Sequence, residues 1–276
     1  MKNLQHKIYI FIRNYPQLTR RNYPYFKGGI IIFQVEVKSD ILKEILNVVS
    51  TLVDEAKFNI NEDGISLRAV DPAHVAMIDL KLKSSAFENY KASELELGID
   101  ITKMADVLRL AKPNDLISIN HDEEKNRLII KVLNITRSMA LVDTTGMAEP
   151  KVPNLTLPAK VVISTQELTQ GIKASESVSD HISLSATPEG FELSSEGDTD
   201  AVNLKLSKEL LAELKCKESV KSLFSLDYFS NMVKSASGTE SITMNLGTDF
   251  PVKIEFNIAG GNGEVNYLLA PRIESE

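Results

Sequence analysis

The sequence predicts an α+β fold that consists of two copies of one domain, and three observations support this prediction. The segment DLISIN at residues 115–120 returns as ESITMN at residues 240–245, 125 positions further on, with the same acidic start, alternation and final Asn. The same offset aligns further segments in the same order, including RLIIKV at 127–132 with VKIEF at 252–256. Within each copy, helical and strand periodicities follow one another along the chain.

The first copy is predicted to run as helix, strands, helix and strands. Residues 101–112 predict a short helix that stops before Pro113. Segments that alternate or run apolar between turn residues predict strands at 65–70, 75–82, 95–100, 115–120 and 127–132. The opening helix, at residues 39–56, is predicted from apolar side chains at every third or fourth position, at Ile41, Leu42, Ile45, Leu46, Val49, Leu52 and Val53.

The second copy repeats this order, with helices predicted at 164–177 and 226–236. Ser39 and Ser164 stand at equivalent positions where a side chain is expected to cap each opening helix. A Pro-rich stretch separates the copies and is expected to be extended, because proline fixes φ and lacks a backbone donor. The predicted organisation is therefore a first domain at 32–143, a connecting linker at 144–159 and a second domain at 160–276.

Residues 1–31 differ in composition from the rest of the chain. They hold six Lys and Arg residues, no Asp or Glu, and six aromatic residues. A targeting arm is one interpretation, since transit peptides are rich in Arg and poor in acids. The segment has almost no Ser and no clean amphipathic period, which favours a disordered extension instead.

The overall composition is that of a soluble globular protein, with 43% hydrophobic and 25% charged residues. A single cysteine, Cys216, excludes an internal disulfide and is typical of a reducing cytosol. No apolar run approaches the roughly 18–20 residues that span a bilayer, so no membrane partner is expected. The net charge of −7 argues against nucleic-acid binding at first sight, and without the basic extension it becomes −13.

The sequence shows no catalytic or cofactor-binding signature. A phosphate loop, a nucleophile elbow and a dinucleotide fingerprint are all missing from it. The glycines at 260–263 lie between two strands and predict a hairpin turn. The motif DPAH at 71–74 offers Asp and His either to a metal or, as we expect, to a turn that presents His74. We therefore expect neither an enzyme nor a bound cofactor or metal.

The segments LRAVDPAHVAMIDLKL at 67–82 and YLLAPRIESE at 267–276 carry a specific resemblance. They resemble the archaeal and eukaryotic sliding clamps of the proliferating cell nuclear antigen family, and the match covers residues 33–275. The resemblance implies a homotrimeric ring, with the helices lining a central hole and antiparallel sheets outside. It also implies a processivity factor that encircles double-stranded DNA, in the cytoplasm and at the nucleoid of an archaeal cell.

The resemblance further implies a DNA-facing set of cations on the helices. Duplex DNA is densely charged, so a few inward cations would hold it without reading its sequence. Without the resemblance, these side chains would be taken to solvate amphipathic helices. Four positions that are usually basic in the family are Glu44, Ser50, Asp106 and Gln170 here. The implied set is Lys43, Lys103, Arg109, Lys112, Lys173 and Lys234.

A second implied site is a pocket beneath the linker for partner peptides of the PIP-box type. The implied partners are DNA polymerase, the clamp loader (replication factor C), flap endonuclease and ligase. Taken without the family, the same apolar residues would be assigned to the core. The matching positions are Val70, His74, Val75, Met147, Val152, Leu155, Pro251, Leu268, Ala270, Pro271 and Ile273.

The third implied site is the contact between subunits. The strand with Leu128, Ile130 and Val132 is expected to be the last of the first domain and to form its edge. It would pair with the neighbour's strand that carries Val202, Leu204 and Leu206, and ring closure would cover both edges. Two other readings remain open, namely a subunit of a hetero-ring and an enzyme on a duplicated α+β fold.

Overall fold

The computed structural model describes residues 33–272. The basic extension at 1–31 lies outside the described residues, so its disorder stays a prediction. The first copy of the repeat contains β1 (Phe33–Lys38), α2 (Ser39–Ser50), β2 (Glu55–Asn61), β3 (Gly64–Val70), β4 (Ala76–Lys83), β5 (Asn89–Ala92), β6 (Leu95–Asp100), α3 (Ile101–Leu108), β7 (Leu116–Asp122), β8 (Arg127–Val132) and β9 (Ile135–Ala140).

The second copy has the same order of helices and strands. The elements of the second copy are β10 (Ala159–Ser164), α4 (Thr165–Ser175), β11 (His181–Thr187), β12 (Gly190–Glu196), β13 (Ala201–Ser207), β14 (Glu213–Lys215), β15 (Val220–Ser225), α5 (Leu226–Ser235), β16 (Ser241–Leu246), β17 (Val252–Ile258) and β18 (Gly263–Leu269).

No helix in the described part of the chain is long and apolar enough to cross a membrane.

The sheet topology confirms the predicted duplication and the α+β fold. The order β5-β1-β7-β8-β9 in the first copy returns as β14-β10-β16-β17-β18 in the second. The four strands β13-β12-β11-β15 correspond in the same way to β4-β3-β2-β6. The two segments that revealed the repeat, in β7 and β16, occupy the same place in their sheets.

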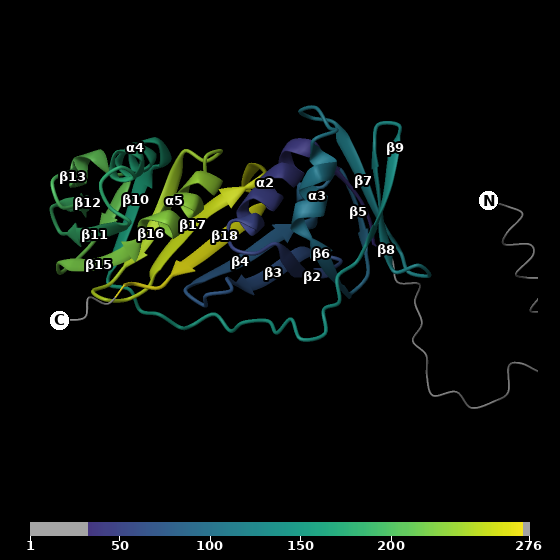
Figure 1. The fold of residues 1–276 in the computed structure, drawn as a ribbon, viewed down its shortest axis with the longest axis horizontal. Coiled ribbons are helices and arrows are strands. Elements are labelled where there is room, and N and C mark those ends of the chain that lie inside the picture. Colours follow the sequence, from purple (N-terminus) through teal and green to yellow (C-terminus); the bar gives the residue numbers. More distant parts are fainter. Residues whose placement is uncertain (1–32, 273–276) are drawn as a thin grey trace, which may run out of the picture. The chain divides into compact units, whose positions relative to one another are not determined.

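Within residues 33–272, one strand pair joins the two copies. Strand β18 pairs antiparallel with β4, from Gly263 opposite Leu82 to Leu269 opposite Ala76. This pairing merges strands of both copies into one nine-stranded sheet (Figure 1). We call the β18–β4 pair the junction.

The helices and the linker lie on opposite faces of this sheet. Alternate residues of β18, Val265, Tyr267 and Leu269, are buried, and the Tyr267 hydroxyl donates to the Val48 carbonyl of α2 at 2.6 Å. Burial raises the pKa of Tyr267 to about 12. The residues between them point the other way, towards the linker that runs past the sheet in Figure 1.

The ends of the predicted helices differ from the observed ones for local reasons. Helix α2 ends at Ser50 rather than near residue 56, because β2 already begins at Glu55. Neither expected serine cap forms. The hydroxyl of Ser39 donates to the Lys112 carbonyl instead, at 2.7 Å. An unexpected cap occurs at α3, where the Asp100 carboxylate accepts from the Lys103 N–H.

The predicted edge of the first domain is wrong by one strand. Strand β8 lies between β7 and β9, and Leu128, Ile130 and Val132 are buried in the core. The last strand and the edge is β9, in which only Met139 is buried. The chain turns back at Leu133, whose φ of 53° is in the left-handed region. Because Met139 is its one buried residue, strand β9 lacks the apolar alternation from which strands are predicted.

Candidate functional site

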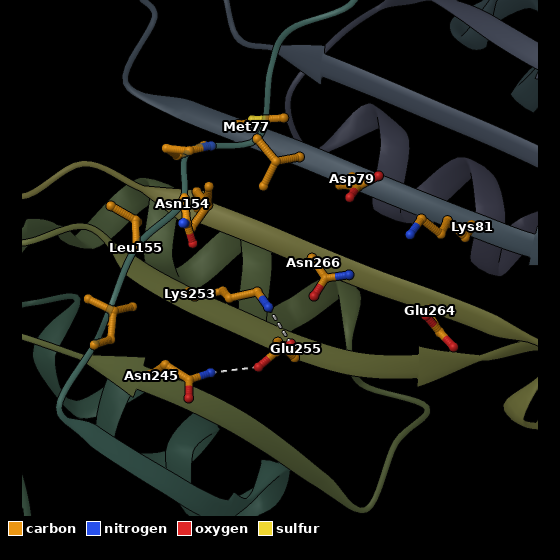
Figure 2. A pocket seen from close by; sticks show the side chains of 14 residues that line it. Met77, Asp79, Lys81, Asn154, Leu155, Asn245, Lys253, Glu255, Glu264 and Asn266 are labelled. Carbon is orange, nitrogen blue, oxygen red and sulfur yellow. Dashed lines mark hydrogen bonds and ion pairs between the residues drawn. The ribbon is translucent and has the colours of Figure 1, made fainter.

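The outer face of the nine-stranded sheet forms a groove beneath the linker. Neighbouring strands place Val75, Met77 and Asp79 of β4 and its approach opposite Ala270, Leu268 and Asn266 of β18 and its exit. Linker residues cover this face and enclose a groove of about 560 Å³ (Figure 2). The groove is lined by Met77, Asp79, Lys81, Val152, Pro153, Asn154, Leu155, Leu157, Asn245, Lys253, Glu255, Glu264, Asn266 and Leu268.

At one end of the groove, the sheet face that adjoins it is apolar, and we call this region the apolar end. Val75 is 37% exposed, and Val152 of the linker is 42% exposed. Strand register places Val70 opposite Met77, and Met77 opposite Leu268, on this same face. Exposed apolar side chains on one face are typical of a surface that receives an apolar group of a partner.

The other end of the groove is polar and internally paired. Arg68 forms ion pairs with Asp79 at 3.1 Å and with Glu149 of the linker at 3.2 Å. Glu255 accepts from Lys253 at 2.6 Å and from Asn245 at 2.5 Å. Figure 2 shows Asp79, Lys253, Glu255 and Asn245 of this polar end on strands of the sheet beside the linker. The pairing fixes the side chains, and the Arg68–Glu149 ion pair ties the linker to the sheet.

The structure brings most of the predicted pocket residues together. Val152, Leu155 and Leu268 line the groove itself. Val70, Val75 and Ala270 lie on the same face at its apolar end, and Pro251 directly precedes β17 there. The other predicted residues are placed differently. His74 is exposed with φ 58°, Met147 lies in a turn outside the groove, Pro271 follows β18, and Ile273 is outside the described residues.

Sequence reasoning missed Met77 and the whole polar end. Met77 reads as one apolar residue of an ordinary strand, although its position between Val75 and Asp79 places it on the outer face. Phe250, 50% exposed beside Pro251, was also missed. The available signal in the sequence was an aromatic residue within GTDFP at 247–251, a segment of turn-forming residues.

All six cations predicted on the helices are exposed, as the DNA-facing interpretation requires. Lys43 of α2 and Arg109 and Lys112 beyond α3 line one groove of about 310 Å³ between these two helices. Lys103 lies at the opposite end of α3, where a hydrogen bond to Asp100 raises the pKa of its ammonium group. The structure therefore gathers three of the six cations at a single place.

Acidic neighbours reduce the charge of this set. Arg109 pairs with Asp106 at 3.3 Å, and Lys234 pairs with Glu176 at 2.9 Å. Hydrogen bonds from Lys234 and Ser230 lower the pKa of Glu176, although slight burial opposes them. The ion pairs found among residues 33–272 leave Lys43, Lys112 and Lys173 without an acidic partner.

Glu44, one of the departures from the family pattern, has a structural contact. Its carboxylate accepts from the Ala259 N–H at 2.7 Å, at the turn between β17 and β18. The residue therefore holds a turn of the second copy against α2 of the first. This contact accounts for an acid at a position where the family usually has a cation.

Two free strand edges complete the candidate sites. Within residues 33–272, β9 pairs only with β8 and β13 pairs only with β12. Val202 and Leu204 lie on β13 and are half-buried, and Leu206 is buried. Strand β13, predicted as the second domain's part of the subunit contact, is thus a free edge. Strand β8, predicted as the first domain's part, is not an edge, and the free edge of that sheet is β9.

Comparison with known proteins places both halves of the chain in one family. Residues 33–145 match the N-terminal domain model of proliferating cell nuclear antigen, and residues 151–272 match the C-terminal domain model. A DNA polymerase sliding clamp of Methanocella arvoryzae is 44% identical over 246 residues, which cover 89% of this chain and all of that protein.

Solved structures agree with these matches. The A. fulgidus proliferating cell nuclear antigen, solved with the C-terminal region of FEN-1 bound, superposes with a TM-score of 0.83 at 33% identity and covers 88% of this chain and 100% of that one. A chain of the PCNA2–PCNA3 complex from Sulfolobus tokodaii gives a TM-score of 0.77 at 25% identity, with 87% and 100% covered.

Proposed function

The chain belongs to the proliferating cell nuclear antigen family and is a DNA polymerase sliding clamp, and we propose that three such chains close into a ring around duplex DNA. In this ring the helices face the DNA, and the groove beneath the linker holds partner proteins. The protein then acts by tethering enzymes to DNA rather than by catalysing a reaction. The ring is proposed to work at the nucleoid, in the cytoplasm of an archaeal cell.

The observation that carries the ring proposal is the junction. By the repeat, β18 corresponds to β9, and β4 corresponds to β13. The chain therefore contains one paired copy of the contact that β9 and β13 leave open. Pairing β9 of one subunit with β13 of the next would repeat the junction between subunits, and a closed ring leaves neither edge exposed.

The junction also supports a specific register for the proposed contact between subunits. Val265 of β18 lies opposite Leu80 of β4, and Tyr267 lies opposite Ile78. Ile135 of β9 pairs with Val132 of β8, just as Val265 of β18 pairs with Phe256 of β17, so Ile135 corresponds to Val265. In the same way Leu204 of β13 pairs with Leu193 of β12, as Leu80 of β4 pairs with Leu67 of β3, so Leu204 corresponds to Leu80. We therefore propose that Ile135 packs against Leu204 of the neighbouring subunit, and Arg137 lies opposite its Val202.

Mass measurement on the purified chain tests the ring. Light scattering is expected to give three times the 30.6 kDa of one chain. A single-subunit mass at micromolar concentration would contradict a homomeric ring and favour a hetero-ring instead. The PCNA2–PCNA3 complex among the relatives makes that second outcome a specific alternative.

The exposed helical cations support the DNA-facing role. Because each neutralised phosphate releases counterions, binding that uses these cations falls with rising salt. Replacing Lys43, Arg109, Lys173 and Lys234 by Ala is expected to make the slope of log K against log salt shallower, with the subunit mass unchanged. An unchanged slope would mean that the four side chains face elsewhere. A matched control replaces Lys83, Lys91, Lys151 and Lys217, which are exposed and lie off the helices.

The groove supports the proposal that partner proteins bind the outer face. The related A. fulgidus protein was solved with the C-terminal region of FEN-1 bound. We propose that DNA polymerase, the clamp loader (replication factor C), flap endonuclease and ligase use this groove through PIP-box peptides. An apolar anchor of the peptide would bind at the apolar end, where Val75 and the linker residue Val152 are exposed.

A further inference from the structure

The turn at residues 71–75 leads directly into β4 and adjoins the apolar end of the groove, where Met77 lies opposite Leu268. It connects β3 to β4 and ends in Val75, whose carbonyl accepts from the Ala270 N–H at 2.8 Å. His74 within it has φ 58°, a left-handed conformation that a non-glycine residue holds only when its surroundings fix it. The position of Val75 beside the groove therefore depends on what fixes this turn.

A buried carboxylate organises the turn. Asp71 is 2% exposed, and it accepts from the N–H groups of Ala73, Val75 and Ala76 at 2.9, 2.8 and 2.6 Å. A buried carboxylate is costly unless hydrogen bonds satisfy it, and here the donors are the backbone of the turn itself. Losing a donor to Asp71 would therefore loosen the turn and Val75 with it.

The fourth donor comes from the other copy of the repeat. The hydroxyl of Tyr228, on α5, donates to Asp71 Oδ2 at 2.7 Å. It is the one side chain among the four donors. Burial raises the pKa of Asp71, but the hydrogen bonds from Tyr228 and the three backbone groups lower it below its ordinary value. The bond to Asp71, followed by burial, raises the pKa of Tyr228.

We propose that Tyr228 is a positioning residue for the partner groove. From a helix of the second copy, it holds Asp71 and so fixes the 71–75 turn that places Val75 at the apolar end. The inference rests on the groove being the partner site proposed above. It gives helix α5, which carries Lys234 on the DNA-facing side, a direct hydrogen-bonded connection to the partner face.

The test uses the full-length chain and a synthetic peptide of the FEN-1 C-terminal region that is bound in the related A. fulgidus structure, with binding measured by calorimetry. Tyr228→Phe removes only the hydroxyl and is expected to weaken binding about tenfold, which corresponds to about 1.4 kcal/mol. Ala270→Arg, which places a charged side chain in the groove, is expected to abolish binding. The subunit mass should be that of the wild type in both variants.

Tyr90→Phe is the matched control. Tyr90 is also half-buried, and its hydroxyl donates to the carbonyls of Asn61 and Gly64 at 2.8 and 2.7 Å, at the β2–β3 turn away from the groove. Its removal should lower the unfolding temperature while the peptide affinity stays within twofold of the wild type. A double-mutant cycle of Tyr228→Phe and Asp71→Asn should be non-additive in peptide affinity, because both substitutions break the same hydrogen bond.

The outcomes separate the two proposals. If Ala270→Arg abolishes binding and Tyr228→Phe leaves it unchanged, the positioning role is overturned and the groove stands. If neither variant changes affinity, the groove assignment fails and the positioning role fails with it. Equal weakening by Tyr90→Phe and Tyr228→Phe would assign the effect to general stability and would also overturn the inference.

Discussion

The junction and the free edges are built from repeat-related strands, but only the junction is paired within the chain. At the junction, Val265 and Leu80 are 1% and 0% exposed and lie opposite each other. The residue of the free edge β9 that corresponds to Val265 is Ile135, which is 48% exposed. The residue of the free edge β13 that corresponds to Leu80 is Leu204, which is half-buried. Two repeat-related strands, β18 and β4, are thus paired within the chain, while their counterparts β9 and β13 each keep one unpaired edge. Each unpaired edge is available to a strand of another subunit.

The open edges also differ from the junction in composition. Strand β9 carries Thr136, Arg137 and Ser138 where β18 carries Asn266, Tyr267 and Leu268. Polar and charged residues on an unpaired edge discourage pairing with arbitrary strands. The polar residues of β9 therefore protect an unpaired edge, whereas β18 is already paired with β4 within the chain and needs no such protection.

The largest effect is expected from a charge placed on the free edge. Ile135→Asp would bury a carboxylate opposite Leu204 of the neighbour, which costs several kcal/mol per contact. We expect a single-subunit mass by light scattering at concentrations where the wild type is a trimer. Ile135→Val is the control and should keep the trimer. A trimer of Ile135→Asp with wild-type affinity would break the proposed correspondence between β9 and β18.

The equivalent position in the junction should respond differently. Val265→Ala removes buried methyl groups inside the chain, so it should lower the free energy of unfolding by about 2 kcal/mol. The measurement is denaturant unfolding in the Ile135→Asp background, where subunit dissociation does not contribute. The trimer mass of Val265→Ala alone should remain that of the wild type. A loss of association without a loss of stability would contradict the assignment of junction and edge.

The smallest effect is expected from deletion of residues 1–31. The repeat and its core begin at β1, in which Phe33, Val35 and Val37 are buried, so the extension is not needed to complete either copy. Deletion should leave the number of subunits unchanged and the unfolding midpoint within about 2 °C of the wild type. A larger fall in the midpoint would show that the extension contributes to the folded ring.

Much of this architecture could be predicted from the sequence, because its signals are local or periodic. The four helices within residues 33–272 follow apolar stripes, and the duplication follows from the repeated strands β7 and β16. The exposure of the helical cations follows from the same stripes, since they occupy the opposite face. Their role on DNA, the register between subunits and the domain limits remain predictions.

Other features needed the tertiary structure, because no local pattern encodes them. Strand β9 buries a single side chain, so its sequence has no alternation to reveal it, and the sequence predicts β8 as the edge instead. The junction is held by backbone hydrogen bonds between β18 and β4, which leave no mark in the side-chain pattern. The Tyr228–Asp71 bond joins residues 157 positions apart. Which elements form, and that they form twice, can be predicted from the sequence alone, because each segment carries its own periodic pattern of apolar residues. Which edges pair and which distant side chains meet depends on packing between segments, and neither segment carries a local signal of the other.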